Sequence, residues 1–123
     1  MGKCPHYCIQ TIFNLFLIYI NLNRMKKIGL LSDTHNVWDE KYETYFANCD
    51  EIWHAGDIGS LELAGKFESF KPFRAVYGNI DDFSTRRTYP ETVRFSLENT
   101  EVLMTHIGGY PGKYDPKIRA QLF

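Results

Sequence analysis

"IGLLSDTHN", residues 28–36, places an apolar run directly before five polar residues. The run 27–31 predicts a strand buried on both faces of a sheet. Ser, Asp and Asn favour turns because they hydrogen bond to their own backbone, so the polar half fits an ordinary turn. Asp and His are also ligands of transition metals. This stretch alone therefore leaves both a turn and a metal site open.

The composition suits one globular domain of modest size, since 44% of the 123 residues are hydrophobic. A net charge of −1 gives no basic field of the kind that favours a nucleic-acid partner. Cys4, Cys8 and Cys49 do not form an obvious disulfide framework. Cys4 and Cys8 bracket His6, but a structural zinc site needs a fourth ligand.

Residues 1–24 differ from the rest of the chain. Their segment "CIQTIFNLFLIYINLN" is apolar, yet shorter than the roughly 20 residues that a membrane span needs. No small-residue cleavage site of a signal peptide follows it. Met25 precedes what looks like the natural opening of an α/β domain. We therefore expect residues 1–24 to be a non-native or disordered extension, residues 25–123 to form the domain, and the protein to be cytoplasmic without a membrane partner.

From Lys27 onward, short apolar runs alternate with stretches of helical spacing. Ser60 is placed to cap one helix, and Leu63, Phe67 and Phe70 would form its buried side. Strands that alternate with helices indicate βαβ units and a parallel sheet. The predicted elements are strands at 27–31, 51–55 and 73–78, helices at 38–50 and 60–70, an antiparallel hairpin across 92–106 joined by residues 98–100, and a helical fragment from Asp115.

Polar residues follow the carboxyl end of each predicted strand, where open α/β sheets place their ligand sites. Asp33 and His35 follow the first strand, Asp57 the second and Asn79 the third. His106 follows the second strand of the hairpin. Each residue has a plain explanation as a turn or a cap, but four strand ends that all carry a ligand type are much less expected by chance.

The motifs "SDTH", "HAGDI", "YGNID" and "MTHIGG" make the chain from Met25 to about Tyr114 resemble the calcineurin-like metallophosphoesterases. The similarity is greatest to their small bacterial and archaeal phosphodiesterase branch, which also contains the scaffold subunit of the retromer complex. The resemblance implies an α/β fold in which helices flank a β-sandwich. It also implies hydrolysis of a small phosphoester, most often a phosphodiester, by a hydroxide that bridges two divalent metal ions.

The same resemblance assigns roles to the five residues at the strand ends. Asp33 and His35 would bind the first metal, Asn79 and His106 the second, and Asp57 both, with Asp57 and Asn79 as the catalytic residues. Two divalent ions about 3.5–4 Å apart clamp a phosphoryl group and activate a water molecule. Mixed oxygen and imidazole ligands suit manganese, which we expect here, and also nickel, iron or zinc.

The chain departs from the family pattern at two places. Many members carry a histidine after the motif asparagine that helps to protonate the leaving group, whereas this chain has Ile80, which we interpret as a marker of the branch. Members also end their site with a late Gly-His-x-His element, and this chain has no histidine after His106. We therefore expect a domain that is truncated and incomplete at its C-terminus.

Several interpretations stay open at this point. The leading hypothesis is a metal-dependent phosphodiesterase, and the alternatives are an inactive protein-binding scaffold of the same fold or an inactive truncated product. His54 could face the site or bond to the backbone, and the pair 86–87 could contact a phosphate or form a solvated face. Asp81 and Asp82 more simply shape a turn. Nothing in the sequence specifies the substrate or an oligomeric state.

Overall fold

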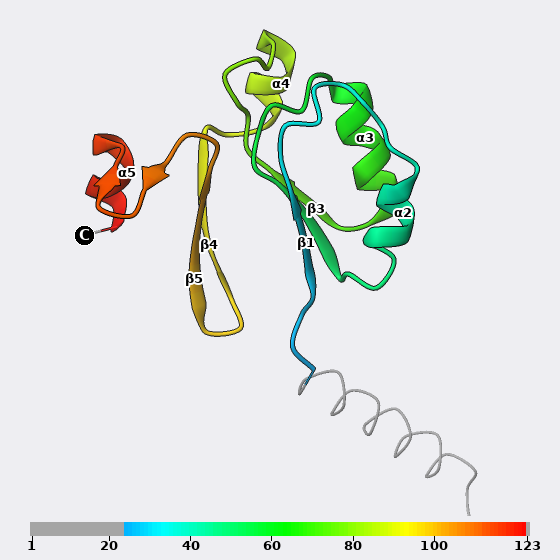
Figure 1. Ribbon diagram of the computed structural model, residues 1–123, viewed down its shortest axis with the longest axis horizontal. Coiled ribbons are helices and arrows are strands. Elements are labelled where there is room, and N and C mark those ends of the chain that lie inside the picture. Colours follow the sequence, from blue (N-terminus) through cyan, green and yellow to red (C-terminus); the bar gives the residue numbers. More distant parts are fainter. Residues whose placement is uncertain (1–23, 123) are drawn as a thin grey trace, which may run out of the picture.

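Three parallel strands organise the part of the chain that the computed structural model describes, residues 24–122 (Figure 1). They are β1 (Ile28–Leu31), β2 (Glu51–His54) and β3 (Phe73–Ala75), hydrogen bonded in the order β1-β2-β3. The predicted parallel sheet is therefore confirmed. Our expectations for residues 1–23, including the cysteine pair near the N-terminus, lie outside the described residues and stay predictions.

Two helices cover one face of this sheet, α2 (Lys41–Tyr45) and α3 (Leu61–Phe70). The cap predicted for α3 is confirmed, because the Ser60 hydroxyl accepts the N–H of Leu63 at 3.2 Å. Its predicted buried side is also present, with Leu63 and Phe67 buried in one cluster and Phe70 packed at the edge of that cluster.

The helix predicted over 38–50 is wrong in its bounds, since α2 is only five residues long. Trp38 lies ahead of the helix, and its ring packs 4.9 Å from that of Phe67. Tyr45, in the last turn of α2, is 66% exposed. No residue of α2 is buried, and a helix that buries so little gains too little from packing to extend further.

An antiparallel hairpin covers the opposite face of the sheet. It consists of β4 (Thr92–Leu97) and β5 (Thr100–Thr105), joined by Glu98 and Asn99 at φ 47° and 65°. Two left-handed residues make the tight turn whose twist suits a hairpin, so the connection is one residue shorter than predicted. The ring of Trp53 on β2 meets that of Phe95 on β4 at 4.9 Å, edge to face. The expected α/β class, with packed sheets and flanking helices, is confirmed.

Leu30 corrects our expectation that β1 is buried on both faces. Its side chain is 64% exposed, although its strand neighbour Trp53 is buried. The apolar cluster on the hairpin side forms around Trp53, Val76 and Met104 and does not extend over Leu30. Within residues 24–122, β1 is thus an edge strand with one apolar side chain facing solvent.

Some short elements were not predicted. They are α4 (Phe83–Thr88), which the Asp82 side chain caps, and the small hairpin of β6 (Gly109–Tyr110) and β7 (Lys113–Tyr114). The helical fragment expected from Asp115 is α5 (Pro116–Leu122). In the described range, no helix is both long and apolar enough to cross a membrane.

Candidate metal centre

The loops after β1 and β2 run side by side beyond the ends of their strands. The N–H of Asp33 donates to the Gly56 carbonyl at 3.0 Å, and the N–H of His35 donates to the Asp57 carbonyl at 3.0 Å. Asn36 continues the series with a bond of 2.8 Å to the Ile58 carbonyl. Backbone hydrogen bonds therefore set the spacing between the loop that carries Asp33 and His35 and the loop that carries Asp57.

Residues in these two loops adopt left-handed backbone conformations. The φ angles of Asp33, His35 and Asp57 are 58°, 44° and 56°. For residues other than glycine the left-handed region costs free energy, although Asp and Asn adopt it more readily than other residues do. Such conformations persist where the surrounding structure enforces them, and they cluster at functional sites.

The five residues predicted as metal ligands meet at this edge of the sheets. Ligand atoms of Asp33, His35 and Asp57 lie within 4.8 Å of one another. The Oδ2 atom of Asp57 is 3.6 Å from His35 Nε2 and 3.3 Å from His106 Nε2. On the far side, His106 Nε2 is 3.1 Å from Asn79 Oδ1. Asp57 is thus the central residue, with one pair of candidate ligands on each side.

Burial differs between these side chains. Asp57 is only 5% exposed, whereas Asp33 and His35 are about half exposed, at 53% and 52%. A buried carboxylate needs compensating charge or hydrogen bonds. One oxygen of Asp57, Oδ1, accepts the N–H of Ile80 at 3.1 Å, and the other faces the two imidazoles. The centre therefore combines a buried middle with an open side.

His106 is oriented by the backbone. Its Nδ1 lies 2.7 Å from the carbonyl of Ala55, and because a carbonyl only accepts, Nδ1 carries the proton in this bond. In the neutral imidazole this leaves a lone pair on Nε2, which faces Asp57 and Asn79. Histidine ligands of metals are held in the same way by their second nitrogen.

The carboxyl group of Asp33 is ionised more readily than an ordinary one. A hydrogen bond from the Ser32 hydroxyl is the main cause that lowers its pKa, and slight desolvation opposes it. The nearby imidazoles of His106 and His35 lower the pKa further. Asp33 is therefore a carboxylate at neutral pH, as a metal ligand must be.

His54 bonds to residues of the two loops, and its ring does not contact the candidate ligands. The side chain is fully buried, and its Nδ1 accepts the N–H of Gly56 at 3.2 Å. Its Nε2 donates to the Thr34 hydroxyl at 2.9 Å, and that hydroxyl donates to the Ile58 carbonyl. Burial lowers the pKa of His54 to about 4, so the ring is neutral. Of the two interpretations left open, the backbone-bonded one is correct.

Asp81 joins the loop after β3 to the loop after β2. Its carboxylate accepts the N–H groups of Gly78 at 2.8 Å, Ile58 at 3.2 Å and Gly59 at 2.8 Å. The prediction that Asp81 shapes a turn is confirmed. Sequence reasoning missed its bonds to Ile58 and Gly59, because no local pattern shows contacts across two strands.

We expect Gly78→Ala to lower the free energy of unfolding by about 1–3 kcal/mol, the usual cost of overpacking. An added Cβ would lie 2.0 Å from Asp57 Oδ1 and 2.4 Å from the Asp57 nitrogen, so the central carboxylate must move. Urea unfolding measures the change. Gly65→Ala is the matched control, because its Cβ meets nothing within 4 Å in α3, and it should raise stability by about 0.5–1 kcal/mol. Equal stability of the two variants would contradict this account.

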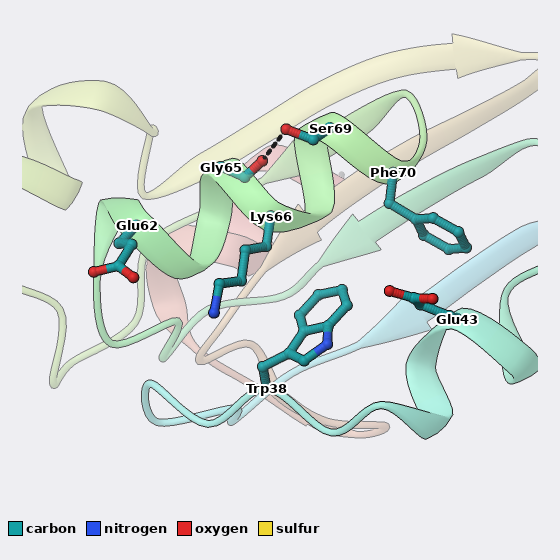
Figure 2. Close-up of a pocket in the computed structure, with 7 residues that line it drawn as sticks. All are labelled: Trp38, Glu43, Glu62, Gly65, Lys66, Ser69 and Phe70. Atoms are coloured by element: carbon teal, nitrogen blue, oxygen red, sulfur yellow. Dashed lines mark hydrogen bonds between the residues drawn. The ribbon is translucent and has the colours of Figure 1, made fainter.

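Two surface hollows differ in their relation to the centre. One of about 500 Å³ lies between α2 and α3, where Trp38 faces Lys66 and Phe70 (Figure 2), and it contains none of the predicted ligands. The other, of about 210 Å³, adjoins the centre. Its lining consists of Tyr77, Gly78, Asn79, Arg86, Glu91, Thr105, His106 and Ile107. The smaller hollow is therefore the one with access to candidate ligands.

An α/β fold with carboxylate and imidazole groups gathered at the strand ends is typical of metal-dependent phosphoesterases. The chain belongs to the calcineurin-like phosphoesterase superfamily, because residues 25–122 match the model of the calcineurin-like phosphoesterase superfamily domain. A curated relative, the "Probable metallophosphoesterase" of Methanothermobacter thermautotrophicus, is 32% identical over 89 residues. The match covers 68% of this chain and 51% of that protein, so the chain spans about half the length of the curated relative.

Solved structures of Vps29 share the fold. The protein from Chaetomium thermophilum superposes with a TM-score of 0.52 at 13% identity, over 62% of this chain and 44% of that one. A single-substitution variant from Entamoeba histolytica gives 0.53 at 13% identity, over 77% and 56%. At this identity the likeness concerns the fold alone.

Proposed function

We propose that residues 25–123 form a domain that hydrolyses small phosphodiesters with two divalent metal ions, manganese being preferred. The observation that supports this most directly is the position of Asp57 Oδ2, 3.6 Å from His35 Nε2 and 3.3 Å from His106 Nε2. A ligand shared by two ions must lie between two sets of ligands, as this carboxylate does. In this proposal the ligands are Asp33, His35, Asp57, Asn79 and His106.

The donor set fits such ions. It offers carboxylate oxygens, an amide oxygen and imidazole nitrogens, which suit manganese, iron, nickel and zinc and include no thiolate. Asp33 and His35 are half exposed, so water and substrate have access from that side. When bound, the two ions would supply an acidified water nucleophile and neutralise charge on the phosphoryl group.

The protein's own contribution is orientation. Ile80 holds one oxygen of Asp57, and Ala55 fixes the ring of His106, so both ligands are ordered before an ion arrives. Preorganised ligands lose little conformational entropy on binding. The Ile80 side chain cannot donate a proton, so protonation of the leaving group would fall to water in the open side of the centre.

Metal binding by the purified chain tests this function before any assay of activity. After treatment with EDTA, calorimetric titration with Mn²⁺ should show two ions per chain, and Mn²⁺ should raise the melting temperature, because a ligand of the native state stabilises it. With Mn²⁺, bis(4-nitrophenyl) phosphate should be hydrolysed faster than 4-nitrophenyl phosphate, and EDTA should stop both reactions. A folded chain that binds no Mn²⁺ would overturn the proposal and favour a scaffold of the same fold.

A further inference from the structure

We propose that Arg86 is a positioning residue that holds the Asn79 loop, residues 78–81, in place for the second metal ion. This inference rests on the proposed function of the centre. The Nε of Arg86 donates to the Asp81 carbonyl at 2.7 Å, and its Nη2 donates to the Asn79 carbonyl at 2.9 Å. One guanidinium therefore joins two carbonyls of the loop.

Helix α4 places this side chain. Asp82 caps the helix by accepting the N–H of Thr85 at 2.8 Å, and Arg86 lies on the next turn. Helical side chains point back toward the N-terminus of their helix, which directs the guanidinium of Arg86 toward the Asn79 loop. The ring of Tyr77, 5.0 Å from the guanidinium carbon, supports it from the other side.

The contacts of Arg86 complete the bonding of the loop. Two N–H groups of the loop already have side-chain acceptors, since Gly78 donates to Asp81 and Ile80 donates to Asp57. Arg86 supplies the donors for the carbonyls of Asn79 and Asp81. Hydrogen bonds from a charged donor are about twice as strong as those between neutral groups. Asn79 itself is exposed, so its position depends on these backbone contacts more than on packing.

The contacts also distinguish the two arginines of the pair 86–87. Arg86 is exposed, yet it uses two of its five N–H donors on backbone carbonyls. Its neighbour Arg87 is exposed and lies over the ring of Phe83 at 5.7 Å. A lysine could not replace Arg86, because an ammonium lacks the planar fork that reaches two carbonyls at once.

Loss of Arg86 should weaken the binding of one ion more than that of the other. Asn79 Oδ1 is 3.1 Å from His106 Nε2, so a displaced loop alters the pair on that side of Asp57. The N–H groups of Asp33 and His35 donate to carbonyls of the loop after β2, which Arg86 does not contact. The Asn79 loop reaches the shared ligand Asp57 through the N–H of Ile80. Loss of Arg86 should therefore weaken the second ion more than the first.

Calorimetric titration with Mn²⁺ of the full chain tests this, with Arg86→Ala, Arg86→Lys and the matched control Arg87→Ala. Both Arg86 variants should bind one ion about 10- to 100-fold more weakly, the usual effect of losing a residue that orients a ligand, and should bind the other ion more weakly by a smaller factor. Arg87→Ala should bind both ions normally. Methylguanidinium should restore binding to Arg86→Ala, and methylammonium should not. Equal weakening of both ions, or none, would overturn the inference.

A measurement without metal separates this inference from the proposed function. In the metal-free chain, NMR signals of the Asn79 side-chain amide and the His106 ring should shift in Arg86→Ala and Arg86→Lys and stay unchanged in Arg87→Ala. If the wild type binds no Mn²⁺ but these shifts occur, the proposed function fails and the positioning by Arg86 stands. If the wild type binds Mn²⁺ and neither signal moves, the positioning role fails alone. Arg86→Lys keeps the test decisive if the alanine variant unfolds.

Discussion

Asp57→Asn is expected to abolish metal-dependent hydrolysis and leave the fold intact. The asparagine oxygen can still accept the N–H of Ile80, which now bonds to Asp57 Oδ1 at 3.1 Å. The amide nitrogen would replace Oδ2, the atom that lies 3.6 Å from His35 and 3.3 Å from His106. A protonated amide nitrogen has no lone pair for a metal, and the negative charge shared by both ions is lost. Hydrolysis of bis(4-nitrophenyl) phosphate with Mn²⁺ measures the effect.

The matched control is Asp82→Asn, which replaces the nearby carboxylate that caps α4. Asparagine caps helices as well as aspartate does, so this variant should retain activity. Mn²⁺ should raise the melting temperature of the wild type and of Asp82→Asn, and should fail to do so in Asp57→Asn. Appreciable turnover by Asp57→Asn would refute the assignment of Asp57 as the shared ligand.

His54→Leu is expected to lower the free energy of unfolding by about 1–3 kcal/mol, the usual cost of an unsatisfied buried polar group. Leucine fills a similar volume, but it leaves the buried N–H of Gly56 without its acceptor. The Thr34 hydroxyl loses its bond to His54 and keeps its bond to the Ile58 carbonyl. Urea unfolding of the wild type and the variant at neutral pH gives the difference directly.

The same histidine should make stability depend on pH. Its pKa is about 4 in the folded protein and near 6.5 in an unfolded chain. Between these values the unfolded state binds a proton that the folded state does not, so stability falls as the pH falls from 6.5 to 4, by up to about 3 kcal/mol. Urea unfolding at pH 7, 6 and 5 should show this slope in the wild type and a smaller one in His54→Leu. Identical slopes would show that His54 is not responsible.

Sequence patterns were informative where ligand residues directly follow apolar strands. Asp33, Asp57 and Asn79 each lie in the loop that follows a strand of one parallel sheet, and parallel strands present their carboxyl ends at one edge. His106 is different, because it follows β5 in a second sheet. Its approach to Asp57 depends on the packing of the hairpin onto the parallel sheet, which alternation along β5 does not reveal. The strand-end pattern made His106 a candidate, and the family resemblance placed it at the site.

The features that were missed are short or non-local. Helix α4 has six residues and no apolar periodicity, and the cap residue Asp82 was its one local signal. Without that helix, the side chain of Arg86 could not be directed at Asn79. The exposure of Leu30 was missed for a related reason, since burial of a strand depends on how far the covering hairpin extends.

The left-handed backbone at His35 places the proposed metal binding in conflict with stability over evolutionary time. At φ 44° a histidine costs about 1–2 kcal/mol relative to an ordinary conformation, and a glycine there would avoid that cost. In a duplicated copy freed from selection for hydrolysis, substitutions that relieve this position would be favoured by the demand for folding alone. Ligand loss at such residues would then yield a more stable domain of the same shape, suited to binding instead of turnover.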